Sequence, residues 1–135
     1  MSGYPQPRRT ATNAPMLDAW QGGALLLQRC RDCAHVFFYP RSACPRCWSG
    51  ALNWVRAGGQ GRVVSYSIVH RGLHDSFVAE APIVLAEIVL AEGALMIARV
   101  VGDGRLSIAA EAPVRLVAPE AAARYPLPTF MLEQG

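Results

Sequence analysis

The chain has 135 residues, of which 52% are hydrophobic and 17% are charged, and its mean hydropathy is +0.18. This composition excludes a disordered chain, which needs low hydrophobicity and high charge, and the length indicates one compact domain or two very small ones. The net charge of +3 comes from arginine without any lysine, and it is too small to indicate nucleic-acid binding by itself.

The most apolar window, residues 81–101, is the one candidate membrane span in the sequence. It contains Glu87, Glu92 and Arg99, and each charge near the centre of a bilayer costs about 2.5–3.5 kcal/mol. The first fifteen residues lack the apolar core of a signal peptide. We therefore expect a soluble, cytoplasmic protein with no membrane partner.

The N-terminal part of the chain predicts an arm, a helix and two strands. Residues 1–15 are rich in Pro, Ser, Thr and Arg without periodicity, so we expect a flexible arm. A short helix over 15–21 is expected to stop at the glycine pair 22–23. Strands are expected over 24–28 and 52–55, followed by a glycine-rich turn at 58–61.

Between these two strands lie all four cysteines, in the pattern C-x2-C-x10-C-x2-C. Each C-x2-C turn places two thiolates on one side of a metal ion, and Zn²⁺ prefers four of them in a tetrahedron. A disulfide framework would need an oxidising compartment, and redox motifs do not come as facing pairs. We therefore predict a structural zinc ion with no open position for substrate, bound by Cys30, Cys33, Cys44 and Cys47.

Four polar residues lie beside the predicted ligands. His35 is expected to pack next to the site or to face solvent, because four thiolates already complete the metal shell. Arg29, Arg31 and Arg46 can offset the negative charge of the thiolates or, alternatively, contact phosphate groups.

From Arg62 onward the pattern changes to strands. Apolar residues alternate over 63–69, residues 83–90 read as a central strand, and further strands are expected over 95–100, 106–108 and 114–117. About five strands in so short a segment favour a closed barrel, because closure removes the sheet edges. The predicted fold is mainly β, with an arm (1–15), a helix and zinc ribbon (16–57), a five-stranded barrel (58–118) and a tail (119–135).

The sequence offers few candidates for catalysis. His70 and His74 have the spacing of a metal pair, but a loop gives this spacing no shared face, and no carboxylate has an assigned place beside them. Glu87 could be a buried acid, although we expect it to face a partner or to pair with Arg99. Because zinc also occupies every thiol, we predict no catalytic residue in this chain.

Several motifs follow one another in a specific order. They are a helix with Trp20, L-x-R-C-x-x-C at 27–33, Tyr-Pro-Arg at 39–41, C-P-x-C at 44–47, Trp54, the strand segment 61–70 and Pro-x-Phe at 128–130. In this order the chain resembles, from residue 16 onward, the bacterial and archaeal family of zinc-ribbon/OB-fold proteins associated with acyl-CoA enzymes. It departs from the family at Ala34, where Gly is usual, and at 111–114, where Gly-x-x-Val is usual.

The resemblance implies a rubredoxin-like zinc ribbon and a five-stranded OB-fold barrel. It also implies a non-catalytic accessory subunit in a hetero-oligomer with a thiolase-like enzyme (C–C cleavage or acyl transfer) or with an acyl-CoA hydratase. The CoA thioester would then be a ligand shared with the partner, and Arg31, Arg41 and Arg46 are the candidates for contacts with its phosphates. The apolar composition fits a permanent interface with such an enzyme.

Two other functions stay open at this point. OB-folds and zinc ribbons also bind single-stranded nucleic acids, which requires positive charge and stacking aromatics. The arginines of residues 1–60 favour this function, whereas residues 61–135 carry a net charge of −2 and the barrel segment has only Tyr66 and Phe77 as aromatics. An enzyme acting through His70, His74 or Glu87 is the third hypothesis.

Overall fold

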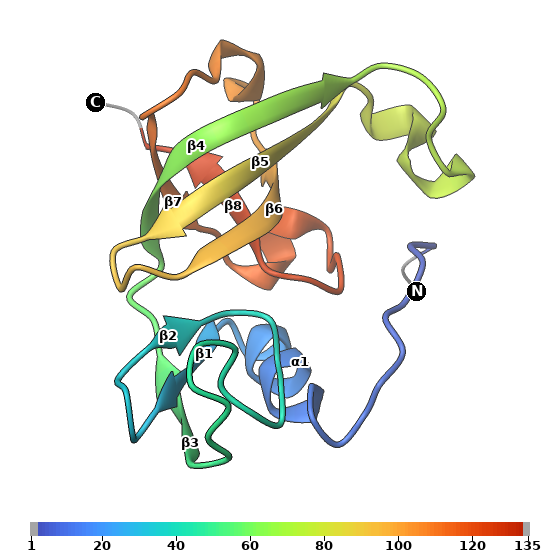
Figure 1. Cartoon of the computed structure of the whole chain (residues 1–135). Coiled ribbons are helices and arrows are strands. Elements are labelled where there is room, and N and C mark those ends of the chain that lie inside the picture. The colour runs from blue at the N-terminus through green and yellow to red at the C-terminus, as the bar shows by residue number, and fades with distance from the viewer. Residues whose placement is uncertain (1–2, 134–135) are drawn as a thin grey trace.

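The structure is a computed structural model that describes residues 3–133. Helix α1 and a small three-stranded sheet form the lower part of the molecule in Figure 1, and a closed barrel lies above them. Within the described residues, no helix is long and apolar enough to cross a bilayer. The small sheet beside a closed five-stranded barrel confirms the predicted mainly β fold.

Helix α1 (Ala14–Gln21) confirms the helix predicted over 15–21. Pro15 lies in its first turn, where a missing backbone N–H breaks no hydrogen bond, and the helix ends at Gly22. Its apolar side is buried, and Nε1 of Trp20 donates a hydrogen bond of 2.8 Å to the carbonyl of Tyr125. The helix is thereby attached to the C-terminal part of the chain.

The ribbon sheet is antiparallel and has the order β2-β1-β3, so the strand that precedes the first cysteine pair is central. Both strands expected here are present, the first shifted by two residues toward the cysteines. Their bounds are β1 (Leu26–Cys30), β2 (Val36–Phe37) and β3 (Leu52–Arg56).

The barrel closes in the order β4-β5-β6-β8-β7, with β7 returning to β4. All neighbours are antiparallel except β6 and β8. Position 61 in β4 requires glycine, because a Cβ there would lie 2.7 Å from the carbonyl oxygen of Val89. The strands are β4 (Gln60–Val69), β5 (Ile83–Leu90), β6 (Leu95–Val101), β7 (Pro113–Leu116) and β8 (Thr129–Leu132).

Two expectations about the barrel are wrong. The segment predicted as a strand at 106–108 contains a short 3-10 helix, η2 (Arg105–Ser107), with Leu106 exposed. The fifth strand is β8, which lies in the predicted tail and inserts between β6 and β7. A four-residue strand far from its partners in sequence gives a weak periodic signal, and its role depends on pairing with distant segments.

Residues 3–13 form no helix or strand, yet this segment is attached to the barrel. Tyr4 is buried and its hydroxyl donates a hydrogen bond of 2.6 Å to Glu80. Its ring stacks on Phe77 and meets Tyr125 edge-on, with centroid distances of 5.2 Å in both cases. The description of residues 1–15 as a flexible arm therefore does not hold at Tyr4, because an aromatic slot on the barrel holds its ring.

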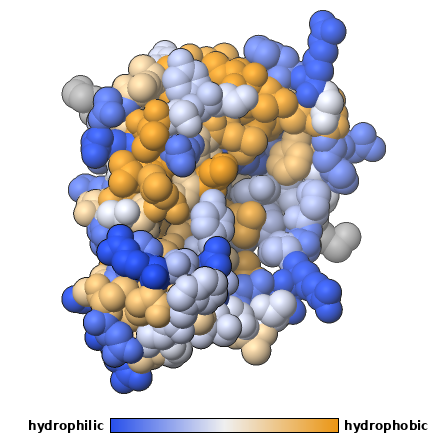
Figure 2. Space-filling view, in the orientation of Figure 1, coloured by the Kyte–Doolittle hydropathy of each residue, from blue (hydrophilic) through white to orange (hydrophobic). Residues whose placement is uncertain are grey.

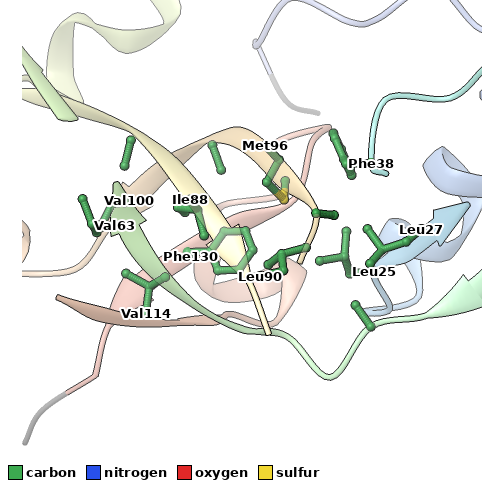
Figure 3. Packing of buried hydrophobic residues seen from close by; sticks show 14 of the residues in the cluster. Leu25, Leu27, Phe38, Val63, Ile88, Leu90, Met96, Val100, Val114 and Phe130 are labelled. Carbon is green, nitrogen blue, oxygen red and sulfur yellow. The ribbon is translucent and has the colours of Figure 1, made fainter. Parts of the chain in front are cut away.

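One hydrophobic core joins the ribbon to the barrel (Figure 3). Leu25, Leu27 and Phe38 of the ribbon half belong to the same buried cluster as Leu90 and Met96 of the barrel. In the space-filling view, most strongly apolar side chains lie over the barrel, whereas the ribbon surface is more hydrophilic (Figure 2). The two halves therefore share a core but present different surfaces.

Candidate metal centre and its surroundings

The two C-x2-C turns have the same local geometry. The backbone N–H of Ala34 donates to the carbonyl of Cys30 at 2.9 Å, and that of Trp48 donates to the carbonyl of Cys44 at 2.8 Å. The residue after each cysteine pair is left-handed, with φ of +64° at Ala34 and +66° at Trp48. Glycine adopts this conformation without steric cost, whereas the Cβ atoms of Ala34 and Trp48 make it strained.

The turns bring the four predicted ligands together. All four sulfur atoms lie within 4.8 Å of one another, with 3.5 Å between Cys30 and Cys47 and 3.6 Å between Cys33 and Cys44. A tetrahedral zinc ion with Zn–S bonds of about 2.3 Å requires sulfur separations of about 3.8 Å. The four cysteines therefore fit a Zn²⁺ ion with little adjustment.

The electrostatics of the four thiols also favour a cation. The backbone N–H of Cys33 lowers the pKa of the Cys30 thiol to about 7, although burial opposes this. At Cys47 the N–H of Ser49 lowers the pKa, but the neighbouring thiols and burial outweigh it and raise the pKa to about 12. Four thiolates cannot coexist in this volume unless a positive ion compensates their charge.

The polar residues near the thiols lie outside the sulfur cluster. The imidazole of His35 stacks on Phe37, with 5.7 Å between ring centroids, and is not part of the sulfur cluster. The side chains of Arg31 and Arg46 are exposed. The hydroxyl of Ser49 donates a hydrogen bond of 2.5 Å to Asp32 and so links the two turns.

Of the three candidate phosphate-binding arginines, Arg41 lies at a cavity between the ribbon and the barrel. This cavity has a volume of about 210 Å³. The backbone of Arg41 is held by the buried Gln28, whose amide accepts from its N–H at 2.8 Å and donates to its carbonyl at 2.9 Å. The lining is mostly apolar and consists of His35, Val36, Phe37, Phe38, Tyr39, Arg41, Pro45, Gly93 and Leu95.

Two residues of this region were missed as functional candidates. Tyr39 connects the halves, because its hydroxyl accepts a hydrogen bond of 2.8 Å from the backbone N–H of Ile97 in β6. The side chain of Trp48 is 78% exposed, and its backbone has a left-handed conformation that is strained for a residue other than glycine. The Tyr-Pro-Arg motif was the available signal for Tyr39, but its partner lies 58 residues away in sequence.

The alternative catalytic residues are not brought together. His70 is exposed, whereas Nδ1 of His74 accepts a hydrogen bond from the N–H of Ser76 and caps the 3-10 helix η1 (Asp75–Glu80). In the described part of the chain, the four cysteines form the one group of three or more potential metal ligands. The histidine metal pair therefore has no third ligand beside it.

Of the two roles expected for Glu87, the ion pair with Arg99 is wrong, because Arg99 pairs with Glu80 at 2.5 Å. The register of β5 and β6 places Leu85, not Glu87, opposite Arg99. The guanidinium carbon of Arg99 also lies over three aromatic rings, at 5.7 Å from the centroid of Tyr4, 5.5 Å from that of Phe77 and 5.2 Å from that of Tyr125.

Glu80 is the charged partner in this aromatic cluster. Burial alone would raise its pKa, but hydrogen bonds from Tyr4 and Arg99 and the charge of Arg99 lower the pKa below its usual value. The carboxylate therefore stays ionised and holds Arg99 and Tyr4 in place. This makes the cluster an anchor for the N-terminal segment.

Two family profiles match this architecture in tandem. Residues 17–53 match the rubredoxin-like zinc ribbon domain of ChsH2, and residues 54–118 match the C-terminal OB-fold domain of ChsH2. The chain is also similar to a solved chain described as "Ltp2-ChsH2(DUF35) aldolase", with 33% identity, a TM-score of 0.80 and coverage of 94% of this chain and 98% of that chain. A DUF35 protein from Sulfolobus solfataricus, 15% identical with a TM-score of 0.65 over 91% of this chain and 86% of that chain, shares the fold.

Curated relatives have two kinds of name. A probable enoyl-CoA hydratase alpha subunit from Thermomonospora curvata is 34% identical over 93% of this chain and 39% of that protein. A DUF35 domain-containing scaffold protein from Methanocaldococcus jannaschii is 38% identical over 54% of this chain and 52% of that protein. The chain thus spans about 39–55% of the length of such relatives.

Proposed function

Because the chain belongs to the DUF35 family, with the zinc ribbon and OB-fold domains of ChsH2, we propose that it is a non-catalytic accessory subunit of a thiolase-like acyl-CoA enzyme. The observation that carries this proposal is the similarity, over nearly the full length of both chains, to a chain of the Ltp2-ChsH2 aldolase. The name "scaffold protein" of two relatives agrees with a non-catalytic role.

The four clustered cysteines bind one structural zinc ion in this proposal. A closed shell of four thiolates leaves no coordination site for substrate, so the ion stabilises the ribbon and takes no part in the reaction. The thiols must stay reduced to bind the metal, which agrees with a cytoplasmic location.

The CoA thioester is shared between this subunit and the enzyme. Arg41 supports this part of the proposal, because it lies at the largely apolar cavity between ribbon and barrel and its backbone is held by Gln28. A guanidinium group next to an apolar slot can bind a phosphate while the slot covers part of the pantetheine chain. Arg31 and Arg46, exposed on the ribbon, are further phosphate contacts.

A hydratase partner is the second candidate, because one relative is named as a probable enoyl-CoA hydratase alpha subunit. The subunit would have the same role in such a complex, and the enzyme partner would determine the reaction.

Co-expression with the thiolase-like or hydratase-like protein encoded beside this chain's gene tests the function. We expect one complex in size-exclusion chromatography with light scattering, and turnover of acyl-CoA by the complex but not by this chain alone. Turnover by the isolated zinc-loaded chain would contradict a non-catalytic role.

Calorimetric titration of the complex with CoA tests the shared ligand. We expect Arg41→Gln to weaken binding by about tenfold, the typical effect of one charge-assisted contact, whereas Arg115→Gln on the exposed side of β7 should leave it unchanged. If wild type and Arg41→Gln bind CoA with equal affinity, Arg41 is not part of the CoA site.

A separate titration of the free chain with a single-stranded oligonucleotide tests the nucleic-acid alternative. Tight binding that weakens steeply with salt would favour this alternative.

A further inference from the structure

The outer face of strands β5 and β6 carries apolar side chains in register. Along β5 the residues alternate, so that Leu85, Glu87 and Val89 point away from the barrel core. The pairing places Glu87 opposite Ile97 and Val89 opposite Leu95. Cross-strand neighbours on one face lie about 5 Å apart, so these side chains form one continuous patch.

Three apolar side chains of this patch are exposed to solvent. Ile97 is 63% exposed, Leu95 is 51% exposed and Leu85 is 38% exposed. Tyr39, which is 48% exposed, extends the patch onto the ribbon through its hydrogen bond to Ile97. Figure 2 shows apolar side chains gathered over the barrel.

The adjacent outward position, Arg99, shows how this chain covers the same face elsewhere. Arg99 is 7% exposed because the rings of Tyr4, Phe77 and Tyr125 enclose its side chain. No comparable cover from the described residues lies over Ile97, which stays largely exposed one row further along the strand. The apolar patch therefore begins where the cover provided by the chain itself ends.

Glu87 lies in the middle of the patch and indicates what covers it. Its side chain is partly buried, with Ile97 opposite it on β6 and Ser65 opposite it on β4, and it takes part in none of the ion pairs formed within residues 3–133. The arginines on the two neighbouring strands of this face, Arg62 and Arg99, are paired with Glu111 and Glu80 instead. An apolar patch with a central unpaired carboxylate is complementary to an apolar surface that carries one positive charge.

A second copy of this chain is a poor occupant. A two-fold dimer centred on this face would place the Glu87 carboxylates of both copies close together, and like charges in an interface are unfavourable. We propose that the β5–β6 face, defined by Tyr39, Leu85, Glu87, Val89, Leu95 and Ile97, is the docking surface for the enzyme subunit, which places a basic side chain against Glu87. This inference rests on the proposed function and specifies the interface.

Single substitutions in the full complex test this surface. We expect Ile97→Arg to weaken binding of the enzyme by about 30-fold or more, the effect of removing a central apolar contact. Glu87→Gln should weaken binding by about tenfold and Glu87→Lys by more. The matched control is Val78→Arg, which places the same charge on a residue that is 61% exposed in η1, outside this face, and it should change the affinity by less than about twofold.

Binding is measured by surface plasmon resonance with the purified enzyme, after circular dichroism and zinc content have shown that each variant is folded. If Ile97→Arg and Glu87→Lys bind the enzyme as tightly as wild type does, the proposed docking surface is wrong while the proposed function stands. If wild type does not bind the enzyme at all, the proposed function and this inference are both wrong.

A photo-cross-linking amino acid, p-benzoylphenylalanine, identifies the occupant without relying on weakened binding. Placed at position 97, it should form a covalent product with the enzyme subunit, and placed at position 78 it should not. A product between two copies of this chain from position 97 would overturn the proposal in favour of a homodimer.

Discussion

At the scale of single residues, the metal centre contains two backbone positions with a left-handed conformation that their residues, which are not glycine, adopt only with strain. Ala34 and Trp48 both have positive φ values directly after a cysteine pair. A left-handed non-glycine residue costs about 1–2 kcal/mol because Cβ approaches the carbonyl oxygen. The hydrogen bonds from these two residues to Cys30 and Cys44 hold the turns in this conformation.

We expect Ala34→Gly and Trp48→Gly each to increase the free energy of unfolding of the zinc-loaded protein by about 1 kcal/mol, because glycine removes the steric cost. Urea unfolding at constant zinc concentration measures the change. The matched control is Ala109→Gly, at an exposed position without positive φ, which should lower stability by about 0.5–1 kcal/mol. A loss of stability in Ala34→Gly equal to that of the control would contradict the explanation.

At the scale of elements, the barrel depends on its last strand. β8 pairs with β6 in parallel and with β7 in antiparallel orientation, so its removal would open the barrel. Thr129 and Phe130 are fully buried, although both belong to the segment that the sequence suggests is a tail. Ending the barrel at residue 118 therefore leaves out β8, which the tertiary structure includes in the closed barrel.

Phe130→Ala should lower the free energy of unfolding by about 3–5 kcal/mol, because it leaves a cavity at the centre of the barrel. Met131→Ala, one residue further along β8 and only partly buried, should cost clearly less. Denaturant unfolding of both variants measures the difference. Equal losses would mean that β8 contributes to stability mainly through its backbone pairing.

At the scale of the whole molecule, the ribbon and the barrel are expected to fold as one unit. Leu25, Leu27 and Phe38 share a buried cluster with Leu90 and Met96 (Figure 3). Tyr39 adds a hydrogen bond between the halves, and Trp20 joins the helix to the C-terminal segment. Loss of the metal should therefore affect residues far from the cysteines.

Chelation of zinc should lower the unfolding midpoints of both halves together, because the ribbon contributes side chains to the core of the barrel. Tryptophan fluorescence reports on the N-terminal half, since Trp20, Trp48 and Trp54 all lie there, and far-UV circular dichroism reports largely on the barrel strands. Coincident transitions before and after chelation are expected. A barrel transition that stays unchanged while the fluorescence transition is lost would show two independent units.

The sequence by itself determined the features that depend on local spacing. The C-x2-C pairs placed four thiols in a metal-binding arrangement, proline and glycine bounded α1, and alternating apolar residues indicated most of the barrel strands. Each of these signals lies within a few consecutive residues, where backbone geometry alone fixes which side chains share a side or a face. The zinc ribbon was therefore predictable from the cysteine segment.

Only the tertiary structure decided how distant segments meet. It inserted β8 between β6 and β7, paired Arg99 with Glu80 instead of Glu87, and placed Tyr4 in an aromatic slot. It also left Ile97 and Leu95 exposed around Glu87 on one face. Strand register controls the insertion of β8 and which side chains share a face with Glu87, because a shift of one residue would turn each of them to the opposite face. The contacts of Arg99 and Tyr4 depend instead on how η1 and the N-terminal segment pack on the barrel, which no local spacing determines.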